Sequence, residues 1–379
     1  MIPPTGQRVC LVSNTAWSIY NYRRTLLHRL LNAGYQVTVI APRDAAFARL
    51  SEIGCQCVDL PLASKGTRVR EDLGTLLALY RLYRRVQPTL IFHYTIKPNI
   101  YGTLAAALAR RASVAVTTGL GYVFLHDNRT ARIAKALYRL AFRFAREVWF
   151  LNRDDHDTFL REHLLAHPER ARLLKGEGVD LAHFAFTPLP ARDTFAFLLI
   201  GRLLWDKGVG EYVEAARRLR ARYPQARFRL LGPVGVDNPS AIEYEQLQRW
   251  VDAGLVEYLG QADDVREAIA AADSIVLPSY REGMPRTLLE AAAMGRPIIA
   301  TDVPGCRDVV DDGSTGLLCA PRDADALAAA MARLLDMSPA ERSTLAHAAR
   351  AKASREFDEN QVVTRYFATL EATSSSSKI

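Results

Sequence analysis

The chain has 379 residues, of which 49% are hydrophobic and 24% charged, and its formal net charge at pH 7 is +8. This composition is typical of a globular protein with sizeable cores, and the length suits two domains. Collagen-like, disordered and disulfide-scaffold classes are excluded. The five scattered cysteines predict reduced cytosolic thiols. No apolar run approaches the roughly 18 residues of a membrane span, and no signal peptide is expected.

Short apolar runs alternate with amphipathic helical patterns along the whole chain. The helical patterns include Leu26 to Ala33 and Leu73 to Val86. Such alternation predicts right-handed βαβ units, and hence parallel sheets with helices on both faces. The predicted strands are 8–13, 36–41, 56–60, 89–93, 113–118, 147–151, 195–200, 227–231, 256–259, 273–277 and 297–300.

The domain organisation follows from this rhythm. The sequence predicts an α/β protein of two doubly wound, Rossmann-like domains, 1–188 and 189–355, with Thr187-Pro-Leu-Pro190 as the linker. Residues 356–379 are predicted to form a closing helix at about 358–372, with a return to the first domain as one option, and a disordered Ser-rich tail. Doubly wound folds bind ligands at the carboxyl ends of their strands, so the function is expected in a cleft there.

Two segments resemble ligand sites but favour plainer interpretations. Gly119-Leu-Gly121 follows a strand, yet the third glycine of a dinucleotide fingerprint is missing, so we interpret it as a tight turn at the cleft. Asp154-Asp-His-Asp157 looks like a metal cluster, but it opens a helix, where negative charge complements the helix dipole. No metal site is predicted.

The segment from Leu277 to Glu290 carries the first chemical signal. A strand ends at Pro278, and Pro285 suits the first position of a helix. The amides of Gly283 and Met284 would then point from a helix N-terminus toward the cleft, as an anion site. Two carboxylates, Glu282 and Glu290, lie at most about 12 Å apart along a helix, which is about the distance from a hexose to the ribose of a nucleotide sugar. The alternative for Glu290 is an ordinary ion pair with Arg286.

A second segment, residues 201–208, also connects the end of a predicted strand to the start of a helix. Strand 195–200 runs into Gly201-Arg-Leu-Leu-Trp-Asp-Lys-Gly208, and a helix follows. Gly201 permits a ligand to approach closely, while Arg202 and Lys207 supply a planar fork and a point charge for phosphate oxygens.

Together these residues resemble the retaining GT-B glycosyltransferases of family 4. The resemblance includes Gly176-Glu-Gly-Val-Asp180, Val256-Glu-Tyr-Leu-Gly260 and 304–313, and it covers essentially the whole chain. Within the family, the chain is most similar to bacterial capsule, O-antigen and N-glycan assembly enzymes, above all N-acetylgalactosaminyltransferases acting on undecaprenyl-diphosphate-linked sugars. The segments 17–23, 97–102 and 119–122 carry this narrower match.

The resemblance implies a UDP-sugar donor held mainly by the second domain. Arg202 and Lys207 would neutralise the diphosphate, Glu290 would hold the ribose, and Glu282 would face the sugar. The expected donor residues are Gly201, Arg202, Lys207, Gly232, Leu259, Gly260, Glu282, Gly283, Met284, Pro285 and Glu290, and the expected catalytic ones Arg202, Lys207 and Glu282. No cofactor or metal is expected, because the cations and the helix dipole stabilise the leaving diphosphate. Transfer is expected to retain the anomeric configuration.

The first domain is expected to bind a lipid-diphosphate-linked saccharide. Many relatives have a histidine at the end of the fifth strand; here the chain reads Val116-Thr-Thr-Gly119, so the sugar contact passes to Thr118 or Gly119. For most of the remaining candidates a structural role is the alternative. The candidate acceptor residues are Asn14, Arg23, His93, Lys97, Thr118, Gly119, Gly121 and His126.

The charge is uneven along the chain. Residues 1–190 hold 26 Lys and Arg against 14 Asp and Glu, whereas the rest hold 23 against 27. Six basic residues recur at helical spacing opposite Ile133, Leu137, Leu140, Ala141 and Phe144, which predicts a helix lying on an anionic membrane; a solvated helix face is the alternative. The six are Arg129, Arg132, Lys135, Arg139, Arg143 and Arg146.

The sequence therefore predicts a cytoplasmic enzyme that is peripheral on the inner face of the cell membrane. One rival is a UDP-sugar epimerase of GT-B shape, which needs the same nucleotide site but no acceptor. A nucleic-acid-binding protein is suggested by the basic charge alone, and the basic residues lack interleaved stacking aromatics. No nucleic acid partner is predicted.

Overall fold

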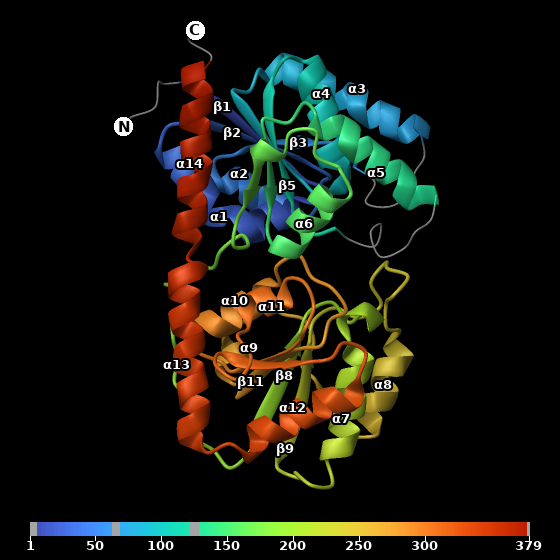
Figure 1. Cartoon of the computed structure of the whole chain (residues 1–379), viewed down its shortest axis with the longest axis vertical. Helices are drawn as coiled ribbons and strands as arrows, with labels where there is room; N and C mark the ends of the chain where they lie inside the picture. Colours follow the sequence, from blue (N-terminus) through green and yellow to red (C-terminus); the bar gives the residue numbers. More distant parts are fainter. Residues whose placement is uncertain (1–5, 63–68, 121–128, 377–379) are drawn as a thin grey trace. The chain divides into compact units, whose positions relative to one another are not determined.

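The computed structural model describes residues 6–62, 69–120 and 129–376. The chain divides into two compact units, Met1–Glu177 with Asn360–Ile379, and Gly178–Glu359 (Figure 1). The division falls before the predicted linker. Residues after Gly178 join the second unit because Val179 donates its N–H to the Phe357 carbonyl at 2.8 Å and pairs with Asp358.

The first unit contains a seven-stranded parallel sheet in the order β3-β2-β1-β4-β5-β6-β7. Its strands are largely buried on both faces, as expected where helices cover a parallel sheet on both sides. They are β1 (Arg8–Val12), β2 (Gln36–Ala41), β3 (Gln56–Asp59), β4 (Leu90–Tyr94), β5 (Ala112–Thr117), β6 (Glu147–Phe150) and β7 (Ala171–Leu173).

One face of this sheet is covered by three neighbouring helices. Alternate residues of the strands, Cys10 and Val12, pack with Leu79 and Tyr83 of α3, and Ala115 packs with Tyr138 of α5. The helices of the unit other than the last are α1 (Ala16–Asn32), α2 (Ala46–Ile53), α3 (Val69–Val86), the π-helix η1 (Pro98–Gly102), α4 (Thr103–Leu108), α5 (Arg129–Phe142), α6 (Arg153–Arg161) and the short η3 (Pro168–Arg170).

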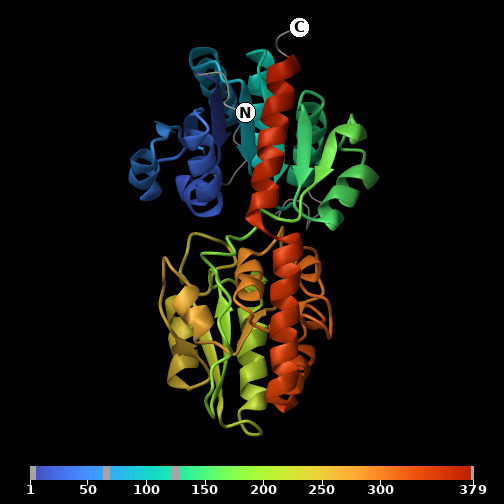
Figure 2. The same cartoon turned by 90° about the vertical axis from the view of Figure 1, so that its left-hand side faces the viewer.

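The last helix, α14 (Glu359–Ser376), packs on the other face of the same sheet (Figure 2). The Tyr366 ring lies 4.6 Å from Phe92 of β4 and 4.8 Å from Trp149 of β6, measured between ring centroids. The predicted disorder of the Ser-rich tail is wrong through Ser375, because Thr373 is buried and Ser374 donates to the Gln7 side chain at 3.1 Å.

The second unit contains a six-stranded parallel sheet in the order β10-β9-β8-β11-β12-β13. After β8, the strands β9 and β10 are added toward one edge of the sheet. β11 then pairs with the other side of β8, and β12 and β13 extend the sheet toward the opposite edge. The strands are β8 (Phe195–Ile200), β9 (Ala226–Leu231), β10 (Glu257–Tyr258), β11 (Ser274–Leu277), β12 (Ile298–Thr301) and β13 (Gly316–Cys319).

Alternation along β8 shows how this sheet is covered. Phe195, Phe197 and Leu199 face one core with α7, α8 and α12, while Leu198 and Ile200 face the other with α9, α10, α11 and α13. The helices are η4 (Trp205–Lys207), α7 (Val209–Leu219), α8 (Tyr244–Asp252), α9 (Arg266–Ala270), α10 (Arg286–Ala293), α11 (Cys306–Val309), α12 (Ala324–Asp336) and α13 (Pro339–Glu356).

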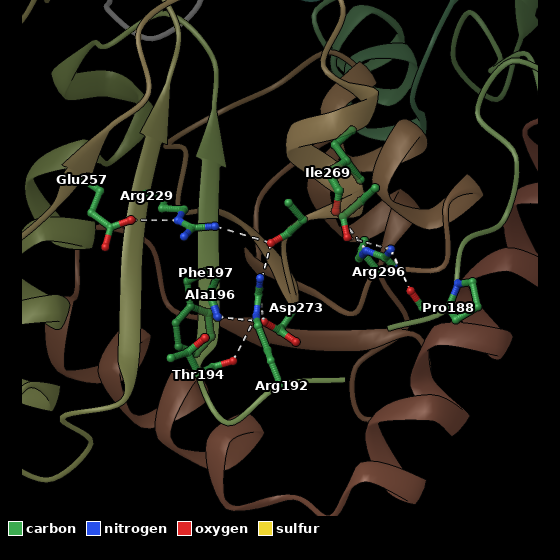
Figure 3. Close-up of polar contacts among 12 residues, drawn as sticks. Pro188, Arg192, Thr194, Ala196, Phe197, Arg229, Glu257, Ile269, Asp273 and Arg296 are labelled. Atoms are coloured by element: carbon green, nitrogen blue, oxygen red, sulfur yellow. Dashed lines mark hydrogen bonds and ion pairs between the residues drawn. The ribbon is translucent and has the colours of Figure 1, made fainter. Parts of the chain in front are cut away.

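The predicted linker is fixed within the second unit by a buried arginine (Figure 3). Arg296 is fully buried and donates to the carbonyl and hydroxyl of Thr187, at 2.8 and 2.6 Å, and to Pro188 and Ile269. Nearby, Arg192 pairs with Asp273 at 2.7 Å, and that carboxylate also accepts the Ala196 amide. Because backbone carbonyls satisfy the guanidinium, residues 187–188 pack as part of this unit.

Candidate active site

The loops that follow β8 and β11 flank the point where the strand order of the second sheet reverses. β8 and β11 are hydrogen-bonded neighbours, yet the chain leaves them toward opposite edges of the sheet. Ligands of open α/β sheets bind at such switch points, outside the carboxyl ends of the strands. The predicted donor residues lie at this carboxyl edge, except for Glu290, which is in the middle of helix α10.

These two loops are bonded to each other. The Asp206 carbonyl accepts the Tyr280 amide at 3.0 Å and the Ser279 hydroxyl at 3.3 Å. Gly208 has a positive φ of 72°, and a Cβ there would lie 2.0 Å from the Pro278 carbonyl oxygen. Only glycine fits so close an approach, so the two loops form one rigid frame.

Within that frame, the Lys207 ammonium forms an ion pair with the Glu282 carboxylate. The two side chains are 23% and 11% exposed, so both remain reachable from solvent while being largely shielded. Arg202, which directly follows Gly201 at the end of β8, is exposed, and within the described ranges it forms no hydrogen bond or ion pair with another residue. A cationic pair and a carboxylate on one edge can bind a diphosphate together with a polyhydroxylated group.

Helix α10 begins one residue later than predicted. Pro285 is the N-cap and Arg286 the first helical residue, so the amides at the helix start belong to Arg286 and Thr287. Gly283 and Met284 precede the cap and are half-buried. The Thr287 hydroxyl donates to the Ile200 carbonyl at 3.5 Å, which holds the helix start at the end of β8.

The second carboxylate, Glu290, lies on α10 with a side chain only 13% exposed. Burial raises the pKa of the Glu290 carboxyl, while the Arg286 guanidinium, 3.4 Å from its oxygen, lowers it. The net pKa is raised, so one cation does not offset the desolvation of this carboxylate. The ion pair foreseen as the alternative is therefore present, and it leaves Glu290 with capacity to accept further hydrogen bonds.

The surface beside the carboxyl ends of β9 and β10 consists of backbone atoms of glycines and one apolar side chain. Gly201 donates to the Leu231 carbonyl at 3.0 Å, and Gly232 donates to the Gly260 carbonyl at 2.8 Å. A Cβ on Gly232, whose φ is 142°, would lie 2.0 Å from the Gly201 carbonyl oxygen. Leu259 is 45% exposed beside these glycines. A flat ring can lie against the two glycines and the Leu259 side chain.

Sequence reasoning missed the residues that fasten the frame. The Tyr280 hydroxyl donates to the Glu211 carboxylate of α7 at 2.6 Å, and the Arg322 guanidinium lies 4.6 Å from the Tyr280 ring centroid. The Thr301 hydroxyl donates to the Ser279 carbonyl. No spacing in the sequence pairs residues so far apart, and each alone is an ordinary polar residue.

In the first unit, four of the predicted acceptor residues lie at the carboxyl edge. Asn14 follows β1, Lys97 follows β4, and Thr118 and Gly119 follow β5; all four are half-buried. The Lys97 ammonium donates to one oxygen of the Asp72 carboxylate at 2.9 Å, and the Tyr101 hydroxyl donates to the other oxygen of that carboxylate.

Two other predicted acceptor residues belong to the core of the first unit. Arg23 is 5% exposed, pairs with Glu177 and lies 3.6 Å from the Tyr94 ring centroid. Burial opposes its charge, but the Glu177 carboxylate raises the pKa of Arg23 above its usual value. The predicted contact with an acceptor is corrected, because the guanidinium is engaged inside the fold.

His93 is fully buried, with its ring nitrogens 2.9 Å from the Tyr83 hydroxyl and 3.3 Å from the Thr103 hydroxyl. Burial lowers the pKa of His93 to about 3. The histidine therefore has the structural role that was its alternative, and the prediction of an acceptor contact is corrected. Gly121 and His126 lie outside the described residues.

The acidic run at 154–157 opens a helix, as predicted. Asn152 is the N-cap of α6, its side chain accepts the Asp155 amide at 2.7 Å, and Asp154 and Asp155 occupy the first turn. Across residues 6–62, 69–120 and 129–376, no group of three or more His, Cys, Asp or Glu residues is arranged to hold a metal ion.

The predicted basic stripe is shorter than expected. Helix α5 ends at Phe142, so Arg143 and Arg146 lie beyond it, and the Arg129 side chain lies outside the described residues. Arg132 is exposed. Lys135 pairs with Glu162 at 2.6 Å, and Arg139 donates to the carbonyls of Glu162 and His163.

The predicted apolar side of this helix is only partly correct, because Ala141 is buried and Leu137 packs against the core while the other three residues are exposed. Ile133 is 54% exposed, Leu140 45% and Phe144 52%. The buried side of the helix consists of Ala131, Ala134, Tyr138, Ala141 and Phe142. Within the ranges that the structure describes, no helix has the length and apolar character needed to cross a membrane.

Comparison with known families and proteins accounts for both units. The family model "Glycosyl transferase 4-like" matches residues 8–152, and the model "Glycosyl transferases group 1" matches residues 194–337. The second match contains the loops after β8 and β11 and helix α10.

Two curated relatives match over most of their length. The N,N'-diacetylbacillosaminyl-diphospho-undecaprenol alpha-1,3-N-acetylgalactosaminyltransferase of Campylobacter jejuni is 29% identical over 377 residues, covering 95% of this chain and 97% of the relative. The UDP-Gal:alpha-D-GlcNAc-diphosphoundecaprenol alpha-1,3-galactosyltransferase of Escherichia coli is 25% identical, covering 81% and 82%.

Solved structures agree on the fold. Sucrose-phosphate synthase from Thermosynechococcus elongatus superposes with a TM-score of 0.81 at 22% identity, covering 98% of this chain and 100% of the other. HepE of Anabaena, solved with UDP and glucose, gives 0.77 at 20% identity, covering 96% and 99%. The two family matches and the paired parallel sheets lead to one conclusion: the chain belongs to the family 4 glycosyltransferases and has the GT-B fold.

Proposed function

We propose that this glycosyltransferase moves a hexose or N-acetylhexosamine from a UDP-sugar to a saccharide linked to undecaprenyl diphosphate. The convergence of Arg202, the Lys207–Glu282 pair and Glu290 at one edge of the second sheet carries the donor part of the proposal. The names of the Campylobacter and Escherichia relatives support the acceptor part, since both act on diphosphoundecaprenol-linked sugars.

Each donor group has a counterpart of suitable chemistry at this edge. The two cations Arg202 and Lys207 take the diphosphate oxygens, and the start of α10 adds its helix dipole. Glu290 accepts hydrogen bonds from the ribose hydroxyls, which also offset the cost of its burial. The uracil ring lies against Gly232, Leu259 and Gly260, and Glu282 faces the sugar.

The proposed chemistry is front-face substitution at the anomeric carbon. The bond from this carbon to the diphosphate oxygen breaks, and a bond to the acceptor hydroxyl oxygen forms on the same face. The acceptor proton passes to the departing phosphate oxygen, so configuration is retained without a protein base. Arg202, Lys207 and the α10 dipole stabilise the negative charge that develops on UDP, which is the role a metal ion would otherwise fill.

The acceptor is proposed to meet Asn14, Thr118 and Gly119 at the carboxyl edge of the first sheet, where all three are half-buried. Because a polyprenyl diphosphate resides in a bilayer, the enzyme is proposed to work from the cytoplasmic side, peripherally on the inner face of the cell membrane. Nucleic acid has no part in this scheme.

The test begins with thermal unfolding in the presence of a panel of UDP-sugars, with EDTA added throughout. The protective sugar is then incubated with a short-chain prenyl-diphosphate saccharide, and the product's anomeric configuration is read by NMR. Transfer with retention in EDTA is the expected result. Inversion refutes the front-face step, loss of activity in EDTA refutes metal independence, and epimer formation without transfer favours an epimerase.

A further inference from the structure

Arg322 has a backbone conformation that is unfavourable for a residue with a side chain. Its φ is 59°, in the left-handed region, and it follows Pro321 in a turn between β13 and α12. Three other non-glycine residues with positive φ, Gln87, Arg110 and His163, lie one or two residues beyond a helix end, where this conformation is common. Arg322 lies instead beyond the carboxyl end of a strand, and backbone strain at such a position suggests a function.

The strained turn places the Arg322 guanidinium over an aromatic ring of the donor loop. The guanidinium lies 4.6 Å from the centroid of the Tyr280 ring, which belongs to the loop after β11. Strand β12 lies between β11 and β13, so the contact joins loops from two non-adjacent strands. Arg322 is exposed, and within the part of the chain that the structure describes it forms no hydrogen bond or ion pair. The cation–π contact is therefore the interaction that the turn provides.

The hydroxyl of the same tyrosine is bound to a partly buried carboxylate. It donates to Oε1 of Glu211, in the first turn of α7, at 2.6 Å. The other oxygen, Oε2, is buried and has no hydrogen-bond partner among the described residues. Burial and the Glu211 carboxylate raise the pKa of Tyr280, so its hydroxyl stays protonated and remains a donor. We name Arg322, Tyr280 and Glu211 the Tyr280 clamp.

The Tyr280 clamp is joined through the backbone to both members of the Lys207–Glu282 pair. Tyr280 lies two residues before Glu282, and its amide donates to the Asp206 carbonyl at 3.0 Å, directly before Lys207. A movement of the tyrosine ring therefore displaces the loops that carry the ammonium and the carboxylate. A displacement of about 1 Å in a charge-stabilising group can cost about 10²-fold in rate.

We propose that the Tyr280 clamp positions the Lys207–Glu282 pair for the departing diphosphate and the donor sugar. Its three members are positioning residues, because each acts through the loops after β8 and β11 and not through contact with the donor. The inference rests on the proposed function, in which this pair meets the diphosphate and the sugar. It adds Arg322, which lies outside the two loops of the donor site, to the residues on which turnover depends.

Three variants of the full chain test the Tyr280 clamp. Arg322→Gly removes the cation and the backbone strain, and Tyr280→Phe removes the hydroxyl but keeps the ring. Glu211→Gln is the conservative change, because its amide oxygen can still accept the Tyr280 hydroxyl. The matched control is His163→Gly, which replaces another exposed residue of positive φ, 53°, in the first unit.

Initial rates over a range of UDP-sugar concentrations separate kcat from KM. Arg322→Gly and Tyr280→Phe are expected to lower kcat about tenfold and to change the donor KM less than about threefold. Glu211→Gln should lose less than about threefold in kcat, and His163→Gly should keep full activity. The melting temperature of Arg322→Gly should stay within about 2 °C of the unchanged protein, because relief of strain offsets the lost cation–π contact.

A double-variant comparison distinguishes positioning from general stabilisation. If the Tyr280 clamp acts through Lys207, Arg322→Gly should lower turnover less than about twofold in a Lys207→Gln background, against about tenfold in the unchanged protein. Equal losses in the two backgrounds overturn the proposal. Normal kcat in both Arg322→Gly and Tyr280→Phe also overturns it.

Amide hydrogen exchange of residues 279–284 tests the Tyr280 clamp without any substrate. The amides of Tyr280 and Glu282 are hydrogen-bonded to the Asp206 and Pro304 carbonyls, so loosening of the loop exposes them to exchange. We expect faster exchange in Arg322→Gly and Tyr280→Phe, and no change in His163→Gly. Unchanged exchange in the two clamp variants overturns the proposal. If the unchanged protein transfers no UDP-sugar while exchange rises as expected, the proposed function fails and the positioning of the loop is upheld.

Discussion

The polar residues predicted near the carboxyl edges of the two sheets differ in their exposure to solvent. At the edge of the second sheet, Arg202, Lys207 and Glu282 lie on loops and keep their charged ends at least partly accessible. In the first unit, Arg23 and His93 come from a helix and a strand and are satisfied inside the core. The two sheets share the order of their first six strands, yet these polar residues are accessible at the second edge and buried in the first unit.

The difference shows how exposure separates a binding role from a packing role. A buried arginine or histidine must find its partners within the fold, because an unsatisfied polar group in the core is costly. Arg23 forms an ion pair with Glu177, and the ring nitrogens of His93 lie within hydrogen-bond distance of two hydroxyl groups. The loop residues Lys207 and Glu282 of the second unit form an ion pair but remain partly exposed, so this constraint is weaker for them. Four experiments test the contrast, in order of decreasing expected effect.

The largest effect is expected from Arg23→Met. Removing the guanidinium leaves the Glu177 carboxylate, 12% exposed, without its cation. Such a loss typically costs about 3–5 kcal/mol of unfolding free energy. Urea unfolding measures it. Arg202→Met is the matched control, and since that residue is exposed its stability should change by less than about 0.5 kcal/mol. Equal costs for the two variants would contradict the contrast.

Lys207→Gln and Arg202→Ala are expected to lower turnover by roughly 10²–10³-fold, the scale of losing one charge-stabilising donor. The reason is that the departing diphosphate then lacks one of its two cations. Initial rates at saturating donor give the comparison. Arg217→Ala serves as control, because this arginine is exposed on α7 and pairs with Glu214. Near-normal rates in Lys207→Gln would remove the main support for the donor site.

His93 predicts a pH dependence of stability in the first unit. Burial lowers its folded-state pKa from 6.5 to about 3, so only the unfolded state gains a proton between these values. The stabilisation is complete above about pH 6.5 and is lost as pH falls, by about 1.4 kcal/mol per pH unit. Unfolding free energies at pH 7, 6 and 5 measure the slope.

His93→Gln should flatten this slope, whereas His347→Gln, at an exposed position on α13, should leave it in place. A slope that persists in His93→Gln assigns the effect to other groups and contradicts the buried neutral histidine.

The smallest effect is expected from Glu290→Gln. Burial raises the pKa of this carboxyl, so its cost to stability is present above the folded-state pKa and disappears below the unfolded one. The neutral amide should therefore raise the melting temperature at pH 7 by about 2–4 °C. The protection given by UDP should fall at the same time. A stabler variant that keeps full UDP protection would separate Glu290 from the ribose.

Much of the fold was predictable because strands buried on both faces give continuous apolar runs. Eleven strands were predicted close to their observed positions. The two that were missed, β7 and β13, have three and four residues and lie at sheet edges. The positions of the proposed donor residues at the carboxyl edge could be predicted because these residues follow strands along the chain.

The partners of those residues were not predictable. Tyr280 meets Glu211, and Asp206 meets Ser279, across separations that no local pattern encodes. Which residues are buried depends on which side of each element packs against the sheet. This accounts for the burial of Arg23 and His93 and for the exposure of Ile133, Leu140 and Phe144. On α5 a face of small residues and Tyr138 packed inward, against the simpler expectation from hydrophobicity.

The sequence by itself determined the class of fold, the two parallel sheets and the positions of the charged loops, because alternation and glycine placement act locally along the chain. Tertiary structure alone decided which polar residues remain accessible and which apolar residues face outward. Accessibility depends on neighbours distant in the sequence, since a side chain is buried by whatever packs over it.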